Sequence, residues 1–142
     1  MEEFLRSNDL VYLSFVRHVL EEADIGYVQL DDHMSALEGS IGVLPRRIMV
    51  ASELIERARL ALDVFVAGIR QHLGSMMIEL AGADAIVFTG GIGENGASIR
   101  ADVCANLQGL GIVLDQAKNA VTRTEGCISA PESISQVWVV PT

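Results

Sequence analysis

The residues with the clearest chemical potential lie in one stretch, residues 84–100, which reads DAIVFTGGIGENGASIR. A short apolar run ends at Thr89, and glycine then fills four of the next seven positions, residues 90–96, which we call the glycine turn. This order predicts a strand, a turn and a helix that begins near Ala97. The first backbone amides of a helix have no partner inside it and carry the positive end of its dipole. Where glycines leave the approach open, such a helix start binds phosphate groups.

The glycine turn also fits a dinucleotide-binding fingerprint. Gly91, Gly93 and Gly96 satisfy the pattern G-x-G-x-x-G between a strand and a helix. Asp115, 24 residues after Gly91, stands near the distance expected of a ribose-binding acid. An NAD-type dinucleotide-binding module is therefore one hypothesis. Two features oppose it: more than 80 residues precede the turn, and Glu94 would meet the pyrophosphate unless its carboxylate turns away. A glycine-rich turn without a ligand is the remaining alternative.

Composition restricts the class of protein. The chain has 142 residues, of which 50% are hydrophobic and 5% aromatic, enough for one ordinary domain with an aliphatic core. The net charge of −9 and the scattered basic residues argue against nucleic acid or a membrane surface as a partner. Cys104 and Cys127 have neither metal-site nor disulfide spacing. The acidic start of the chain and the lack of a long apolar run predict a cytoplasmic protein.

Hydrophobic periodicity predicts the elements that must position the glycine turn. Helices are expected over residues 8–23, with Asn8 or Asp9 as the cap, over residues 30–37, and over residues 52–80, ended by Gly82. Beyond the turn, we expect a helix over residues 97–107 and short strands near residues 112–114, 127–130 and 137–140. The predicted fold class is α/β, a mixed sheet of few strands covered by long helices, with an amino-terminal half that is nearly all helix.

The three histidines do not predict a metal or catalytic site. His18 and His72 fall on predicted helices, where we interpret them as surface or structural residues. His33 lies beside Asp31 and Asp32, but adjacent residues on a helix point in different directions. We therefore interpret this group as a solvated helix start.

Longer strings of sequence resemble a known family. Residues 88–120, FTGGIGENGASIRADVCANLQGLGIVLDQAKNA, resemble the adenosine-motif region of the acetate kinase family, in the superfamily of acetate and sugar kinases, heat-shock ATPases and actin. Residues 58–74 resemble that family's long helix before the motif, and residues 128–142 resemble its closing strands. The resemblance implies a partial ribonuclease-H-like (actin-like ATPase) domain. The whole chain is then a single domain similar to the family's carboxy-terminal half, with a weakly matched helical part (1–50) and a nucleotide-binding α/β part (51–142).

The resemblance also implies a reaction: ATP-dependent phosphorylation of a short carboxylate, which uses Mg²⁺ and yields an acyl phosphate and ADP. The glycine turn would line the adenosine side of the nucleotide pocket through Gly91, Ile92, Gly93, Glu94 and Asn95. Gly91 and Gly93 would let the nucleotide approach the backbone. Ile92 would pack near the nucleotide, and Asn95 would offer an amide. The resemblance assigns no catalytic residue and no metal ligand to this sequence.

Three departures from the family's pattern bear on activity. The family's amino-terminal half, with its acceptor pocket and its catalytic arginine and histidine, has no counterpart in the sequence. Residues 43–48 read VLPRRI where the family has Ser-Ser-Asp-x-Arg, and we interpret Arg46 and Arg47 as solvated. The acidic segment that supplies a magnesium-site glutamate would follow Thr142. We expect a truncated or split kinase without turnover as an isolated chain, with a separate amino-terminal kinase half as a candidate partner.

An interaction module is a further hypothesis. In the family, the carboxy-terminal domain also builds the dimer interface. The apolar faces of the helices over residues 8–23 and 52–80 are large enough to bury a standard interface. The resemblance thus implies a homodimer formed through these helices, or a non-catalytic dimerisation remnant of a kinase.

Overall fold

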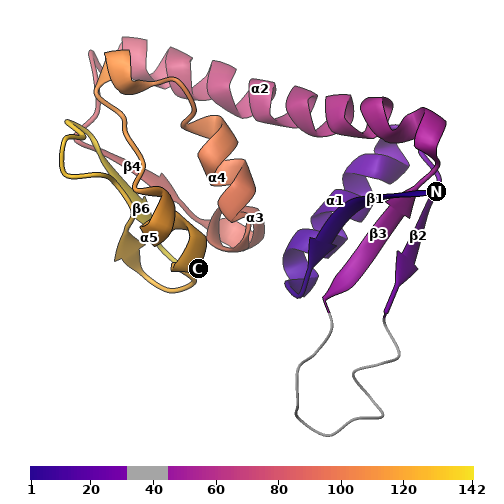
Figure 1. The fold of residues 1–142 in the computed structure, drawn as a ribbon. Helices are drawn as coiled ribbons and strands as arrows, with labels where there is room; N and C mark the ends of the chain where they lie inside the picture. The colour runs from indigo at the N-terminus through magenta and orange to yellow at the C-terminus, as the bar shows by residue number, and fades with distance from the viewer. Residues whose placement is uncertain (32–44) are drawn as a thin grey trace, which may run out of the picture. The chain divides into compact units, whose positions relative to one another are not determined.

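The structure, a computed structural model, describes residues 1–31 and 45–142. These residues form two compact units, Met1–Val64 and Phe65–Thr142, each with its own three-stranded sheet (Figure 1). The boundary falls within the long helix α2 (Ile55–Glu79), so that each unit contains part of this helix.

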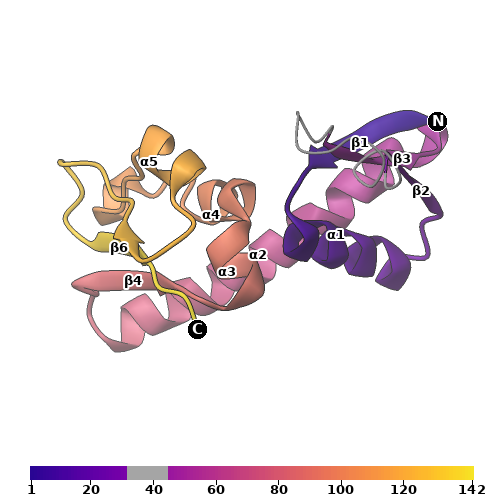
Figure 2. The same cartoon turned by 90° about the horizontal axis from the view of Figure 1, so that it is seen from below.

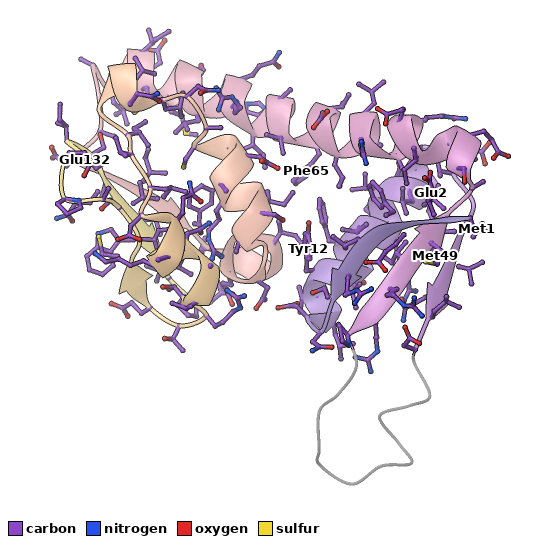
Figure 3. The ribbon with its side chains drawn as sticks, in the orientation of Figure 1. Met1, Glu2, Tyr12, Met49, Phe65 and Glu132 are labelled. Carbon is purple, nitrogen blue, oxygen red and sulfur yellow. The ribbon has the colours of Figure 1, made fainter. Side chains whose placement is uncertain are left out.

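The first unit is an antiparallel sheet with one helix against it. The strands lie in the order β1 (Glu2–Ser7), β3 (Arg46–Val50) and β2 (Tyr27–Leu30), and α1 (Leu10–Glu22) follows β1 along the chain. Figure 3 shows Glu2 of β1 and Met49 of β3 on the neighbouring strands. Apolar residues from α1 and β3 form the core of this unit: Tyr12, Leu13, Val16, Leu20, Ile48 and Val50.

The expectation that the amino-terminal half is nearly all helix is wrong, because three strands lie in it. These strands have four to six residues and mix charged with apolar side chains, so local sequence gives them little signal. β3 is stabilised by pairing with strands distant in sequence, as the registers Glu2 to Val50 and Tyr27 to Val50 show. The helix expected over residues 30–37 lies almost wholly outside the described residues, and Leu30 itself ends β2.

The two helices predicted in this part of the chain are confirmed. α1 begins after Asp9, whose carboxylate accepts a hydrogen bond from the Tyr12 amide at 2.8 Å. The segment expected over residues 52–80 is a short 3-10 helix, η1 (Ser52–Leu54), followed by α2. α2 ends where the Gly82 amide donates back to the Met77 carbonyl at 2.8 Å, a common way to close a helix.

The second unit holds the mixed sheet that the sequence predicts. β4 (Ala85–Phe88) and β6 (Gln136–Val139) are parallel, and β5 (Gly126–Cys127) pairs antiparallel with β6. The core beneath this sheet consists of Ile86, Cys104, Ile112, Leu114, Ile128, Val137 and Val139. Leu73 and Met77 of α2 pack against the core, so the carboxy-terminal part of α2 covers this sheet (Figure 2).

Between β4 and β6 the chain forms short helices: α3 (Gly90–Asn95), α4 (Ala97–Val103), the 3-10 helix η2 (Gln108–Leu110) and α5 (Gln116–Val121). The helix predicted from Ala97 begins where expected but ends at Val103 rather than near residue 107. Arg70 of α2 helps to end it, because its Nη1 donates to the carbonyls of Asp102, Val103 and Ala105 at 3.3, 2.8 and 2.7 Å.

The strand expected at residues 112–114 is only an isolated bridge between Leu114 and Ser129. Two backbone bonds accompany this bridge, from Asp115 to the Ile128 carbonyl and from Ala130 to the Val113 carbonyl, both at 2.9 Å. The Val113 amide instead donates to a side chain, Ser133 Oγ, at 2.9 Å. In the parts of the chain that the structure describes, no helix combines the length and apolar character needed to cross a membrane.

Candidate functional site

The glycine turn follows directly from the end of β4. The Phe88 carbonyl still accepts a hydrogen bond from Val140 at 2.9 Å, and Gly90 then takes a φ of +73°, which favours glycine. Helix α3 starts at Gly90, so the glycine turn is itself a short helix rather than the loop that the sequence suggests. Gly91 is exposed and residues 92–95 are partly exposed. Residues 91–95 are therefore accessible from solvent, whereas Gly96 is buried.

Gly93 lies against the end of β4, at Phe88, as well as within the glycine turn. A Cβ at this position would lie 3.1 Å from the Phe88 carbonyl carbon, tighter than nine in ten real Cβ contacts. Because the neighbouring atom is backbone, it has little freedom to move away. Gly93 thus allows α3 to pack on the end of β4, a role that sequence reasoning did not give it.

Glu94 turns its carboxylate back along α3. Its Oε1 accepts hydrogen bonds from the Thr142 amide at 2.8 Å and from Thr142 Oγ1 at 3.0 Å. These bonds, with a further one from the Gly90 backbone, hold the pKa of Glu94 below its usual value. The negative charge therefore lies near the amino end of α3, where a phosphate would otherwise be favoured. An uncharged group at this turn avoids that repulsion.

Asn95 and Ile92 complete the turn. Asn95 Nδ2 donates to the Gly91 carbonyl at 2.9 Å, so one of its amide hydrogens is already used within α3. Ile92 is partly exposed and lines a hollow of ≈ 290 Å³. The other walls come mostly from apolar residues of α2, β4 and α4, among them Phe65, which is labelled in Figure 3. Such a mostly apolar hollow beside exposed backbone suits a flat, uncharged ring.

Arg100 is a residue of this region that sequence reasoning missed. It is 0% exposed and donates to the carbonyls of Gly93 and Glu94, at 2.8 and 2.7 Å. Burial, and secondarily the charge of Arg123, lowers the pKa of Arg100 to about 10. One signal was present in the sequence: Arg100 lies between Ile99 and Val103, on the side of α4 that had to be buried.

Other residues considered from the sequence have structural partners. Asp115, the candidate ribose-binding acid, caps α5 by accepting a hydrogen bond from the Lys118 amide at 3.0 Å. Arg47, interpreted as solvated, forms an ion pair with Asp31 at 2.6 Å and lies in the first unit. That pair holds the pKa of Asp31 below its usual value. Residues 32–44, which include His33 and the start of VLPRRI, lie outside the described residues.

The described residues also bear on whether this chain could hold a metal ion. Within residues 1–31 and 45–142, no group of three or more His, Cys, Asp or Glu side chains is placed to hold an ion. The described part of the chain therefore does not by itself fit Mg²⁺.

Comparison with known proteins agrees with the resemblance seen in the sequence. A sequence model described as "Acetokinase family" matches residues 6–142. An acetate kinase of Methanosarcina barkeri is 39% identical over 133 residues, which are 89% of this chain and 33% of that protein. The chain thus matches between 22% and 33% of the length of its curated relatives.

Solved structures give the same result. The crystal structure of Porphyromonas gingivalis acetate kinase matches 63% of this chain and 23% of its own, with a TM-score of 0.59 and 41% identity. A propionate kinase from Francisella tularensis matches 64% and 24% of the two chains, with a TM-score of 0.54 and 36% identity. Because the family model matches residues 6–142, this chain belongs to the acetokinase family.

Proposed function

We propose that this chain is the nucleotide-binding, carboxy-terminal portion of an acetate kinase-like phosphotransferase. The reaction moves a phosphoryl group from ATP to a short-chain carboxylate and yields an acyl phosphate and ADP. The family match over residues 6–142 is the observation that carries this proposal. The parallel pair β4 and β6, with the glycine turn at the end of β4, supports a partial ribonuclease-H-like (actin-like ATPase) domain.

The glycine turn is proposed to contact the adenosine part of the nucleotide. Exposed Gly91 leaves the backbone accessible, and partly exposed Ile92 offers an apolar surface to the base. Gly93 shapes the same surface indirectly, by letting α3 pack on β4. Thr142 and Gly90 hold the Glu94 carboxylate ionised at the glycine turn. This negative charge disfavours a phosphate there, so we propose that the uncharged nucleoside binds at the turn instead. Asn95 retains its carbonyl oxygen as an acceptor.

Magnesium is proposed only through the nucleotide. Mg²⁺ usually keeps several waters and binds substrate phosphates with one or two carboxylates. Because the described residues hold no metal-binding cluster, the ion would reach this chain bound to the phosphates of the nucleotide.

Turnover by the isolated chain is not expected. Phosphoryl transfer requires the γ-phosphate, the metal and the acceptor to be aligned, and this positioning supplies most of the catalysis. The chain covers about a third of the length of a whole relative, 33% for the protein of Methanosarcina barkeri. A separate amino-terminal half is the proposed partner that would complete the site.

Two measurements test the proposed function. Calorimetric titration should show saturable binding of ATP and ADP, and weaker or no binding of NAD. Equal or stronger binding of NAD would favour a dinucleotide-binding module instead. A turnover assay with ATP, Mg²⁺ and acetate, propionate or butyrate should yield no acyl phosphate, whereas robust product would contradict the expected inactivity.

A homodimer is the second proposal, and exposed apolar side chains favour it. At the end of α2, Met76, Ile78 and Leu80 are largely exposed. Leu80 lines a hollow of ≈ 650 Å³ together with Leu110 and Ile134. Burial of such side chains against a second copy would be favourable.

Sedimentation of the wild type should therefore show a dimer, and Ile78→Glu should convert it to a monomer. Val121→Glu on α5 is the matched control, because Val121 is 77% exposed and Ile78 80%. A monomeric wild type, or an equal effect of both substitutions, would contradict an interface at this place.

A further inference from the structure

Arg100 is a buried cation whose hydrogen bonds all go to uncharged groups. Its Nη1 donates to the Gly93 and Glu94 carbonyls at 2.8 and 2.7 Å, and its Nε donates to Asn119 Oδ1 at 2.7 Å. Its Nη2 donates to the carbonyls of Asn119 and Thr122 at 2.8 and 3.4 Å. The guanidinium has five N–H groups, and these five bonds use all of them. None of these acceptors is a carboxylate, so within residues 1–31 and 45–142 Arg100 is bound through uncharged oxygens rather than as half of an ion pair.

Two of these acceptors belong to the last residues of α3. The carbonyls at the end of a helix have no partner within it and form the negative end of the helix dipole. A cation at this end is favourable, and hydrogen bonds from an ionised donor are stronger than those between neutral groups. Arg100 therefore fixes the carboxy-terminal end of α3, while the contact of Gly93 with Phe88 fixes its side toward β4.

Asn119 holds Arg100 in this orientation. Asn119 is 3% exposed; its Oδ1 accepts from Arg100, and its Nδ2 donates to the Ala97 carbonyl at 2.8 Å. The amide thus joins α5 to the first turn of α4, next to α3. A lysine at position 100 would keep the charge, but its ammonium has three N–H groups and no planar fork.

We propose that Arg100, oriented by Asn119, is a positioning residue that sets the orientation of α3 and hence the surface which Gly91 and Ile92 present to the nucleotide. The inference rests on the proposed function for its ligand, and on the hydrogen bonds of Arg100 and Asn119 for its geometry.

The first test needs no ligand. Amide hydrogen exchange, followed by NMR in the 142-residue chain, reports on the Gly96 amide, which donates to the Ile92 carbonyl at 2.8 Å. We expect Arg100→Lys to speed this exchange at least about tenfold relative to amides of β6, because several charge-assisted bonds are lost.

Arg70→Lys is the matched control. Arg70 also donates to three carbonyls at a helix end, but that end belongs to α4. Arg70→Lys should lower the free energy of unfolding. The ratio of the Gly96 exchange rate to the β6 exchange rates should stay within about twofold of its wild-type value. An unchanged ratio in Arg100→Lys, or the same change in Arg70→Lys, would overturn the proposal. Asn119→Ala should act in the same direction as Arg100→Lys and keeps the test decisive if Arg100→Lys does not fold.

Nucleotide binding supplies the second readout. The ATP dissociation constant should rise at least about tenfold in Arg100→Lys and in Asn119→Ala, and less than about twofold in Arg70→Lys. An unchanged constant in both of the first two variants would overturn the proposal. If the wild type binds no ATP, the proposed function fails, and the exchange comparison still decides whether Arg100 fixes α3.

Discussion

At the scale of single residues, the glycine turn combines two kinds of glycine. Gly91 is exposed and faces outward, whereas Gly93 is glycine because the backbone of Phe88 lies against it. A G-x-G pattern does not distinguish these two reasons, so the sequence assigned both residues to ligand approach. Only the packing of α3 on β4 separates them.

Gly93→Ala should lower the free energy of unfolding by about 1–3 kcal/mol, because the added methyl group meets backbone and forces α3 to shift. Gly74→Ala in α2 is the matched control, since nothing lies within 4 Å of a Cβ there. It should stabilise the chain by about 0.5–1 kcal/mol, as expected inside a helix. Denaturant unfolding of the three proteins measures both changes, and a neutral Gly93→Ala would contradict the close contact.

Glu94 gives the turn a pH dependence. Hydrogen bonds from Thr142 and Gly90 lower its pKa in the folded chain, so its ionised form stabilises the fold above the ordinary glutamate pKa. This contribution is lost as the pH falls through the folded pKa. Wild type should therefore be more stable than Glu94→Gln at neutral pH, and the difference should shrink in acid. Thermal unfolding at a series of pH values measures it, and a constant or growing difference would contradict these bonds.

At the scale of elements, the sequence predicted those helices and strands that a local pattern of residues determines. β4, β6 and α2 carry long or strongly apolar signals, and α1 has a capping residue. The strands of the first unit were missed because their pairing is non-local and their side chains are half polar. Helix α3 was missed because glycine is a poor helix former, and its helical form depends on β4 and Arg100.

Local sequence pattern likewise predicts only part of the candidate site. The position of the glycine turn follows from a strand and a glycine cluster within a few residues. Arg100 could not be found in that way, since its orientation depends on Asn119, 19 residues later and on a different helix. An inward-facing arginine with no acidic partner in helical register is the signal to look for.

The Asp9 cap allows a test of where the sequence predicts α1 to begin. Asp9→Ala should cost about 1 kcal/mol of stability, because the Tyr12 amide loses its acceptor. Asp9→Asn keeps an oxygen in the same place and should cost clearly less. Denaturant unfolding of both variants provides the measurement. Equal losses would mean that charge, rather than the hydrogen bond, is responsible.

At the scale of the whole molecule, the match to the acetokinase family extends over both compact units. The family match begins at residue 6 and so includes most of the first unit, which contains the antiparallel sheet. The candidate nucleotide surface, its hollow and Arg100 all lie in the second unit, Phe65–Thr142. We therefore propose that the second unit supplies the nucleotide contact, and that turnover requires parts of the relatives that this chain does not span.

The most direct test of the central claim is to locate ATP on the chain by NMR. The isotope-labelled 142-residue protein would be titrated with ATP while its backbone amides are followed. We expect saturable shifts concentrated at residues 90–96, with smaller changes in β5 and β6. Saturable shifts that leave residues 90–96 unchanged, or no saturable shifts at all, would contradict the assignment of the glycine turn as a nucleotide-binding surface.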